Sequence, residues 1–444
     1  PALSRTSTMA ISLLPTFSPY TSVIYLRNHK PLIDQVTLQS DTDLSDLTLS
    51  VNYFPDYVET QTCNIPELKA GTPEIIRPSE PRYELSRLSN ITEEEPGQMT
   101  LVLSHGSEEI LRQSIHFTWL PGNAWVTGKM LQHPELLAAL VQPNDPAVDR
   151  ILYLAGQELL NHGLNPSWTG YGAAKNEIIN KLRAIWRVLS AYGINYALPP
   201  KGKTDAEVGL MQKIRTPSQI IRGGCATCMD STMLMAAVVA QAGYNPIVIT
   251  TRAHAFIGIM LKDEGLNRAV TESVSLLRNL MELGELLVLE TTALGRSEKG
   301  ATSFDEAKLI AEAKLSSCDD FELAYDITQI WSQGIQPINS IQEDLTENVL
   351  SEKLPEDKDA KYLPEQTAAD LEEEESLVSS RKRTRMENWQ LKLLDLSMRN
   401  NLLNCRVDRN QISIFPYPPA RLEDDLSNGK SFRIAELQPN FAID

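Results

Sequence analysis

The sequence contains no run of about 18 consecutive apolar residues, the length that a transmembrane helix needs. The segment Met9–Leu26 is mildly apolar, but Pro15 and Pro19 interrupt it, and it lacks the basic start and cleavage site of a signal peptide. Five cysteines in 444 residues are too few, and odd in number, for a disulfide framework. We therefore expect a cytoplasmic chain that has no membrane partner.

Positive charge is scarce in one stretch of the chain. Residues 341–380 hold 13 acidic residues and 3 lysines, so they carry −10 of the formal net charge of −17. The unbroken acidic run Glu372–Glu375 and the breaks at Pro355 and Pro364 leave little apolar surface to bury. We predict an acidic, disordered linker over 341–384. The net negative charge also argues against direct binding of nucleic acid by the folded part of the chain.

The remaining sequence predicts an α+β fold. Residues 1–118 contain short alternating apolar runs, which suit an immunoglobulin-like β-sandwich of about 100 residues. Residues 119–340 mix helical patterns with strands, and helical spacing returns in 385–444, where we predict the start of another domain. The alternating runs are Val36–Leu38, Leu47–Val51, Met99–Leu103 and Ile115–Phe117, and the helical patterns are Pro134–Val141, Ala147–Asn161, Ala174–Tyr192 and 305–331.

Cys228 stands where a thiol is most easily activated. A glycine pair, Gly223-Gly224, leads into a helix predicted over Asp230–Gln241, whose apolar residues recur at offsets of three and four. Backbone N–H groups and the positive end of the helix dipole favour a thiolate at such a position and can stabilise an oxyanion. We predict that Cys228 is a nucleophile.

Two further residues have the right types and order to assist Cys228. His254 lies near the start of a predicted strand, Ala253–Leu261, that follows the helix and the strand Ile247–Thr250. Glu290 ends a third strand, Leu286–Glu290, after a helical insert over 267–283. Antiparallel pairing of the two strands would bring the carboxylate beside the imidazole, where it could orient the ring and stabilise its cation.

Other readings of these residues stay open. Cys225 and Cys228 form a CxxC pair, but no second pair and no nearby histidines complete a zinc site, so no metal and no cofactor are predicted. Gln212 could donate to an oxyanion, and a structural glutamine is an equal reading. Asp230 could assist the site or simply face the helix dipole. Asp263 and Glu264 compete with Glu290 as the acid, although Gly265 should turn them away.

The ordered elements resemble the transglutaminase-like (papain-fold) cysteine protease superfamily. Its Cys, His-Ala and Asp-Pro-Thr elements correspond here to Thr227-Cys228, His254-Ala255 and Glu290-Thr291-Thr292. Two departures are a glutamate in place of aspartate and a long gap of 36 residues after His254. The resemblance implies acyl transfer on a protein or peptide substrate; glutamine amides or glycan–asparagine bonds are further substrates for such a fold.

A second resemblance covers nearly the whole chain. It is similar to the N-terminal region of very large bacterial helicase–nuclease proteins associated with antiphage defence. The chain has no GxxxxGK[ST] motif, so the resemblance implies a helicase–nuclease partner module in the same or another chain. The matching stretches are Leu136–Asn144, Gly170-Tyr171, Tyr196–Pro200, Gln212–Pro217, Thr227–Asp230, Ala242–Pro246, His254–Gly258, Glu290–Thr292 and Trp389–Asn404.

These observations predict a cysteine hydrolase, most simply a protease, with a Cys228–His254–Glu290 triad. The rival interpretation is a catalytically idle fold of the same kind that serves a helicase as a sensor or docking module. Reactivity of the Cys228 thiol separates the two.

Overall fold

The structure is a computed structural model that describes residues 10–127, 131–198, 211–295, 302–338 and 362–364. All of them belong to the first of the two units into which the chain divides, Pro1–Gln366. Helices and strands are mixed along this unit, as the α+β prediction requires. The predicted domain over 385–444 lies outside the described residues, and so does the predicted linker apart from 362–364.

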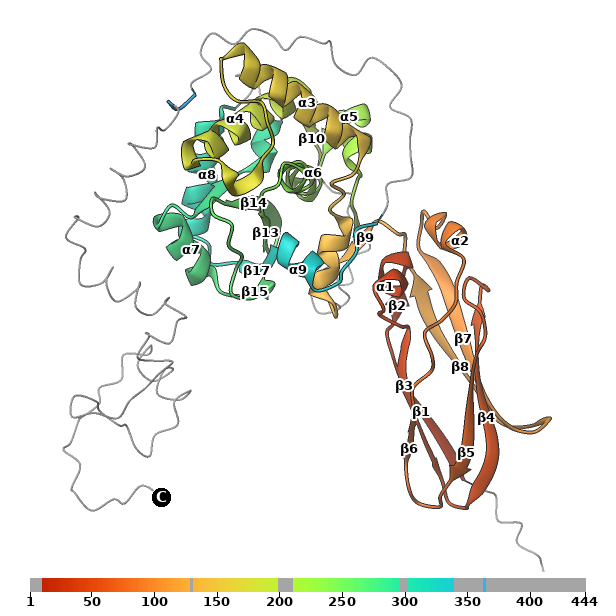
Figure 1. Cartoon of the computed structure of the whole chain (residues 1–444). Coiled ribbons are helices and arrows are strands. Elements are labelled where there is room, and N and C mark those ends of the chain that lie inside the picture. Colours follow the sequence, from red (N-terminus) through yellow and green to blue (C-terminus); the bar gives the residue numbers. More distant parts are fainter. Residues whose placement is uncertain (1–9, 128–130, 199–210, 296–301, 339–361, 365–444) are drawn as a thin grey trace, which may run out of the picture. The chain divides into compact units, whose positions relative to one another are not determined.

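Two sheets form the N-terminal part, and Figure 1 shows them as two layers of long strands. The strand order is β2-β8-β7-β4-β5 in one sheet and β1-β3-β6 in the other. Along β4 and β7, and at the predicted runs in β3 and β8, buried residues alternate with exposed or half-buried ones, which confirms the four predicted alternating runs. The elements are β1 (Ile11–Phe17), β2 (Tyr20–Thr21), α1 (Val23–Arg27), β3 (Ile33–Ser40), β4 (Leu44–Phe54), β5 (Gln61–Leu68), β6 (Glu74–Ile76), α2 (Leu85–Ser89), β7 (Glu95–His105) and β8 (Glu108–Trp119).

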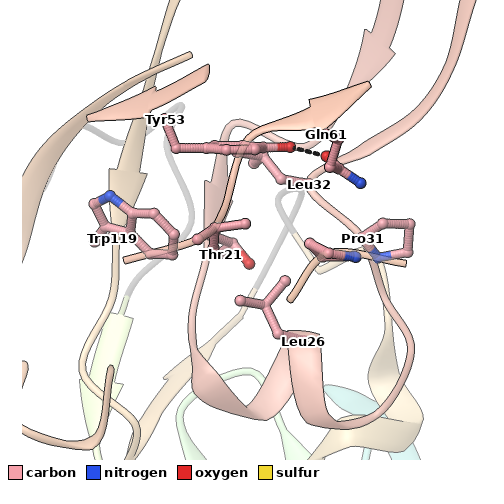
Figure 2. Close-up of a pocket in the computed structure, with 9 residues that line it drawn as sticks. Thr21, Leu26, Pro31, Leu32, Tyr53, Gln61 and Trp119 are labelled. Atoms are coloured by element: carbon pink, nitrogen blue, oxygen red, sulfur yellow. Dashed lines mark hydrogen bonds between the residues drawn. The ribbon is translucent and has the colours of Figure 1, made fainter. Parts of the chain in front are cut away.

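Side chains fill the interior at one end of these sheets. Figure 2 shows the ring of Trp119 and the side chains of Leu26 and Leu32 around a small gap, beside a hydrogen bond from the Tyr53 hydroxyl to Gln61. The gap has no space for a water-sized molecule. It is therefore a packing defect and not a ligand site.

The second part is built on a five-stranded antiparallel sheet of order β15-β17-β13-β14-β16. Helix α6 packs on β13 and β14, and α7 and α8 pack against β16. Its elements are β9 (Ala124–Val126), η2 (Pro134–Leu140), α3 (Pro146–Asn161), η3 (Gly170–Gly172), α4 (Lys175–Ala191), β10 (Asn195–Tyr196), β11 (Met211–Lys213), α5 (Pro217–Gly223), β12 (Cys225–Ala226), α6 (Cys228–Gln241), β13 (Pro246–Thr251), β14 (His254–Met260), β15 (Val270–Thr271), α7 (Val274–Glu282), β16 (Leu286–Leu289), η4 (Thr291–Leu294), α8 (Phe304–Ser316), β17 (Phe321–Asp326) and α9 (Ile327–Ser332).

Three predicted helical segments need correction. Residues 305–331 do not form one helix, because β17 separates α8 from α9 and completes the sheet beside β13. The insert 267–283 contains α7 but begins with the short strand β15. Pro134–Leu140 is a 3₁₀ helix. Strands β15 and β17 pair with each other at the edge of the sheet, so tertiary pairing overrides the local helical pattern in both segments.

The turn after α6 is held by a close backbone contact. Gly170 and Gly243 both have positive φ, and a Cβ on Gly170 would lie 2.9 Å from the Gly243 carbonyl oxygen. The neighbouring Tyr171 hydroxyl donates to the Met260 carbonyl and accepts from the Asn245 N–H, each at 2.9 Å. This junction fixes the turn that connects α6 to the sheet.

Candidate active site

Cys228 is the first residue of α6, and a capping box fixes the start of that helix. The Thr227 hydroxyl accepts the Asp230 N–H at 3.2 Å, while Asp230 accepts the Thr227 N–H at 3.0 Å. Cys228 to Val239 are all buried, so α6 is the central helix that its composition predicted. The thiol of Cys228 therefore sits at the positive end of a fixed helix.

Strand pairing brings His254 and Glu290 together. β14 lies between β13 and β16, and the register pairs Ile257 with Leu289, the last residue of β16. Glu290 follows Leu289 and therefore lies closer to the start of β14, the side of His254 that the predicted antiparallel pairing requires. The Nε2 atom of His254 lies 2.8 Å from Oε2 and 3.1 Å from Oε1 of Glu290.

The charges of this pair stabilise each other. The hydrogen bond with Cys228, followed by the one with Glu290, raises the pKa of His254 from 6.5 to about 9, against the effects of burial and of the Lys314 cation. Burial alone would raise the pKa of Glu290. Hydrogen bonds from His254, Lys314 and Thr292 outweigh burial and lower that pKa to about 2. At neutral pH the site therefore favours an imidazolium beside a carboxylate.

The two ring nitrogens of His254 have different partners. Nε2 faces Glu290, so Nδ1 is the nitrogen left to exchange a proton with Cys228. A further contact ties the segment after Glu290 to the nucleophile helix, since the Thr291 and Thr232 hydroxyls lie 2.9 Å apart. Thr232 also donates to the Cys228 carbonyl at 2.8 Å. These bonds hold the three predicted residues in one site.

Gln212 lies beside the nucleophile, as an oxyanion donor would. β11 pairs with β9, and the side-chain amide of Gln212 donates to the Thr227 hydroxyl at 3.0 Å. One N–H of this amide is used in that bond, which leaves the other for a ligand next to Cys228.

Asp230 has a different position. It is fully buried, and its carboxylate accepts the backbone N–H of Arg215 at 2.8 Å and a guanidinium N–H of Arg215 at 2.6 Å, besides the Thr227 N–H. None of its hydrogen bonds reaches His254 or Glu290. The structure thus makes Asp230 an anchor that joins α6 to the segment carrying Gln212.

The competing residues lie elsewhere. Asp263 follows the far end of β14 and contributes to the electrostatics of Tyr171, whose hydroxyl binds the Met260 carbonyl. Seven residues of extended strand place that end about 20 Å from His254. Cys225 is half-buried on β12. Among the described residues, no three His, Cys, Asp or Glu side chains gather as a metal site.

Three residues join the site without having been predicted. Lys314 of α8 places its ammonium within hydrogen-bond distance of His254 and Glu290. The Thr292 hydroxyl donates to Glu290 at 2.6 Å. Tyr196 hydrogen-bonds Cys228, and its pKa is raised by burial and by the nearby Cys228 and Glu290. The short strand β10, paired in parallel with β12, holds Tyr196 there; no periodicity in two residues could have indicated it.

Comparison with known proteins adds a family match. A family described as "Protein of unknown function (DUF4011)" matches residues 392–442, which lie outside the described residues. No curated protein matches the chain. Among the residues that the structure describes, no helix is both long enough and apolar enough to cross a membrane.

Proposed function

We propose that this chain is a cysteine hydrolase, most simply a peptidase, that forms an acyl-enzyme on Cys228. The observation that carries the proposal is the position of His254, which hydrogen-bonds both the thiol at the start of α6 and the buried carboxylate of Glu290. A nucleophile, a base and a group that orients the base are the parts that acyl transfer requires. We assign residues 119–340 to a transglutaminase-like, papain-related fold and residues 1–118 to an immunoglobulin-like sandwich.

The reaction begins from the ion pair of the Cys228 thiolate and the His254 imidazolium, in which the proton released by the thiol is on Nδ1. The thiolate attacks the carbonyl carbon of the substrate, and the carbonyl oxygen becomes an oxyanion. As the C–N bond breaks, the imidazolium gives its proton to the departing amine, and a thioester remains. Water then attacks the thioester while His254 takes a proton from it, and the acid product leaves as the thiol is restored. Glu290 stays ionised throughout and stabilises the imidazolium.

Two groups suit the developing oxyanion. The backbone N–H at the start of α6 points outward from the first helical turn, where it has no intrahelical partner. The free N–H of the Gln212 amide is the second donor, held beside Cys228 through Thr227. Tyr196 supplies a further hydroxyl, which hydrogen-bonds the thiol. Such preorganised donors usually give the largest single contribution to acyl transfer.

The biological setting that we propose is antiphage defence. The similarity to helicase–nuclease N-terminal regions includes residues 389–404, and the DUF4011 match begins within that stretch. The partner would be a helicase–nuclease module in the same or another chain. The substrate would be a protein or peptide.

Selective alkylation of the thiol tests the proposal. The full chain is treated with iodoacetamide near neutral pH, and the modified cysteines are identified by mass spectrometry. We expect Cys228 to react first and faster than a free thiol, and Cys228→Ala to lose the fast phase while Cys225→Ala keeps it. Uniformly slow reaction of Cys228 would reject the hydrolase and favour the idle sensor or docking module.

A further inference from the structure

Lys314 occupies a position that the proposed triad does not explain. Its Nζ atom lies 3.0 Å from Nε2 of His254 and 2.5 Å from Oε2 of Glu290. Nε2 and Oε2 are also the two atoms that hold His254 and Glu290 together, 2.8 Å apart. The ammonium, the imidazole and the carboxylate thus form a triangle, with the ammonium as the third corner.

The packing of α8 explains how the lysine reaches the site. Ala307, Ala311 and Leu315 form the buried stripe of this helix, and Ala311 and Leu315 pack in one apolar cluster with Phe256 of β14. Alternation along β14 places His254 on the same face as Phe256. Lys314 adjoins the stripe in the last turn of α8, so its side chain reaches His254 at the start of β14. Its side chain is 43% exposed, so the ammonium keeps contact with water.

The chemistry of the three groups makes the contact competitive. An ammonium donates and never accepts, so it can bond Nε2 only when that nitrogen carries a lone pair. When Nε2 carries a proton and donates to Glu290, two N–H groups meet at 3.0 Å and repel each other. Lys314 and the imidazolium therefore compete for one carboxylate oxygen, whose partner oxygen already accepts from Thr292.

We propose that Lys314 is a positioning residue that shares Glu290 with His254 and so weakens the hold of the carboxylate on the imidazole proton. This inference rests on the proposed acyl-transfer function, in which His254 must release that proton to the leaving group. With Lys314 present, the thiolate, imidazolium, carboxylate and ammonium sum to zero charge. The four groups come from α6, β14, the end of β16 and α8, and Tyr196 of β10 faces them as a fifth titratable group.

The test compares variants by readouts that need no substrate. Lys314→Gln removes the cation, and Lys314→Arg keeps it. Lys308→Gln removes a lysine of similar exposure (41%) from the same helix, where it pairs with Glu312. In the full chain with ¹³C-labelled histidine, the His254 resonance is assigned through His254→Asn and titrated. The pH dependence of iodoacetamide reaction at Cys228 is measured in parallel.

A cation favours the deprotonated form of every group beside it, so its removal should move both curves to higher pH. We expect a shift of about half a pH unit in Lys314→Gln, the size expected for a partly exposed ion pair, little shift in Lys314→Arg and none in Lys308→Gln. A lysine that only supported the fold would lower rates at every pH without moving either midpoint. If Lys314→Gln does not fold, Lys314→Met takes its place in the comparison.

Two outcomes separate this inference from the proposed function. If Cys228 of the unaltered chain shows no selective alkylation at any pH, the hydrolase proposal fails and the inference fails with it. If Cys228 reacts selectively but the His254 midpoint stays in place in Lys314→Gln, or moves equally in Lys308→Gln, the role of Lys314 alone is refuted.

Discussion

Replacing Glu290 by glutamine removes one negative charge from the buried side of His254 while keeping the size of the side chain. In the structure this carboxylate is 2% exposed and accepts from His254, Lys314 and Thr292. A glutamine oxygen can still accept from Thr292 and Lys314. The amide nitrogen can donate to Nε2, which would force the ring proton onto Nδ1 and leave no base facing Cys228.

The size of the effect follows from the pKa of His254. Its rise from 6.5 to about 9 corresponds to roughly 3 kcal/mol in favour of the imidazolium, with Cys228 as the first contributor and Glu290 as the second. Loss of the charged hydrogen bond to Glu290 removes about 1.5 kcal/mol of this, which is roughly a tenfold fall in the rate of reaction at Cys228. Loss of the correct tautomer adds to this, so tenfold is the smallest fall expected.

The assay is second-order alkylation of Cys228 by iodoacetamide at pH 7, well below the melting temperature of each variant. Glu285→Gln is the matched control, because Glu285 directly precedes the same strand, β16, and pairs with Lys262 at the surface. We expect full reactivity in that control. Unchanged reactivity in Glu290→Gln, together with loss in Asp263→Asn, would move the acid to the turn after β14 and refute the assignment.

Three other measurements probe the same site. The melting temperature should fall as pH rises from 6.5 through about 9. The pKa of His254 is higher in the folded than in the unfolded chain, so protonated His254 stabilises the fold at low pH, and this contribution is lost as pH rises through about 9. If the melting temperature of Glu290→Gln depends on pH as steeply as that of the unaltered chain, this explanation is wrong. Gln212→Ala should slow p-nitrophenyl acetate hydrolysis about 100-fold but leave iodoacetamide alkylation unchanged, since only acyl transfer forms an oxyanion; equal losses in both assays would make Gln212 structural. Asp230→Asn should lower the free energy of unfolding in urea by about 1–3 kcal/mol, because Arg215 loses a buried carboxylate partner; an unchanged urea midpoint would argue against the anchor.

Local sequence signals were sufficient to predict the elements that carry the proposed triad. The glycine pair Gly223-Gly224 and the apolar spacing after it predicted a helix from Asp230, close to the observed start of α6 at Cys228. The apolar run Leu286–Leu289 after a break predicted a strand, and its antiparallel pairing with β14 is confirmed. Short apolar strands beside a helix have few alternative partners, which is why this pairing was accessible.

Contacts that depend on which helix face meets the sheet could not be predicted in the same way. Lys314 reads as an ordinary surface lysine until Ala311 and Leu315 are known to pack on the face that bears His254. The strand Phe321–Asp326 was missed because it is short and begins soon after the end of α8 at Ser316. Tyr196 lies in β10, and β10 and β15 each have two residues, too few to show an alternation of apolar and polar residues.

The contact between Gly170 and Gly243 limits how chains with this fold can vary. A Cβ on Gly170 would collide with the Gly243 carbonyl oxygen at 2.9 Å, a Cβ on Gly243 would lie tightly against the Gly170 Cα at 3.1 Å, and both glycines have the positive φ that other residues avoid. A substitution at one position cannot be rescued by a smaller residue at the other, because nothing smaller exists. The two glycines, with the tyrosine that follows the first, therefore make a compact signature by which distant relatives could be recognised even where the residues around the thiol have changed.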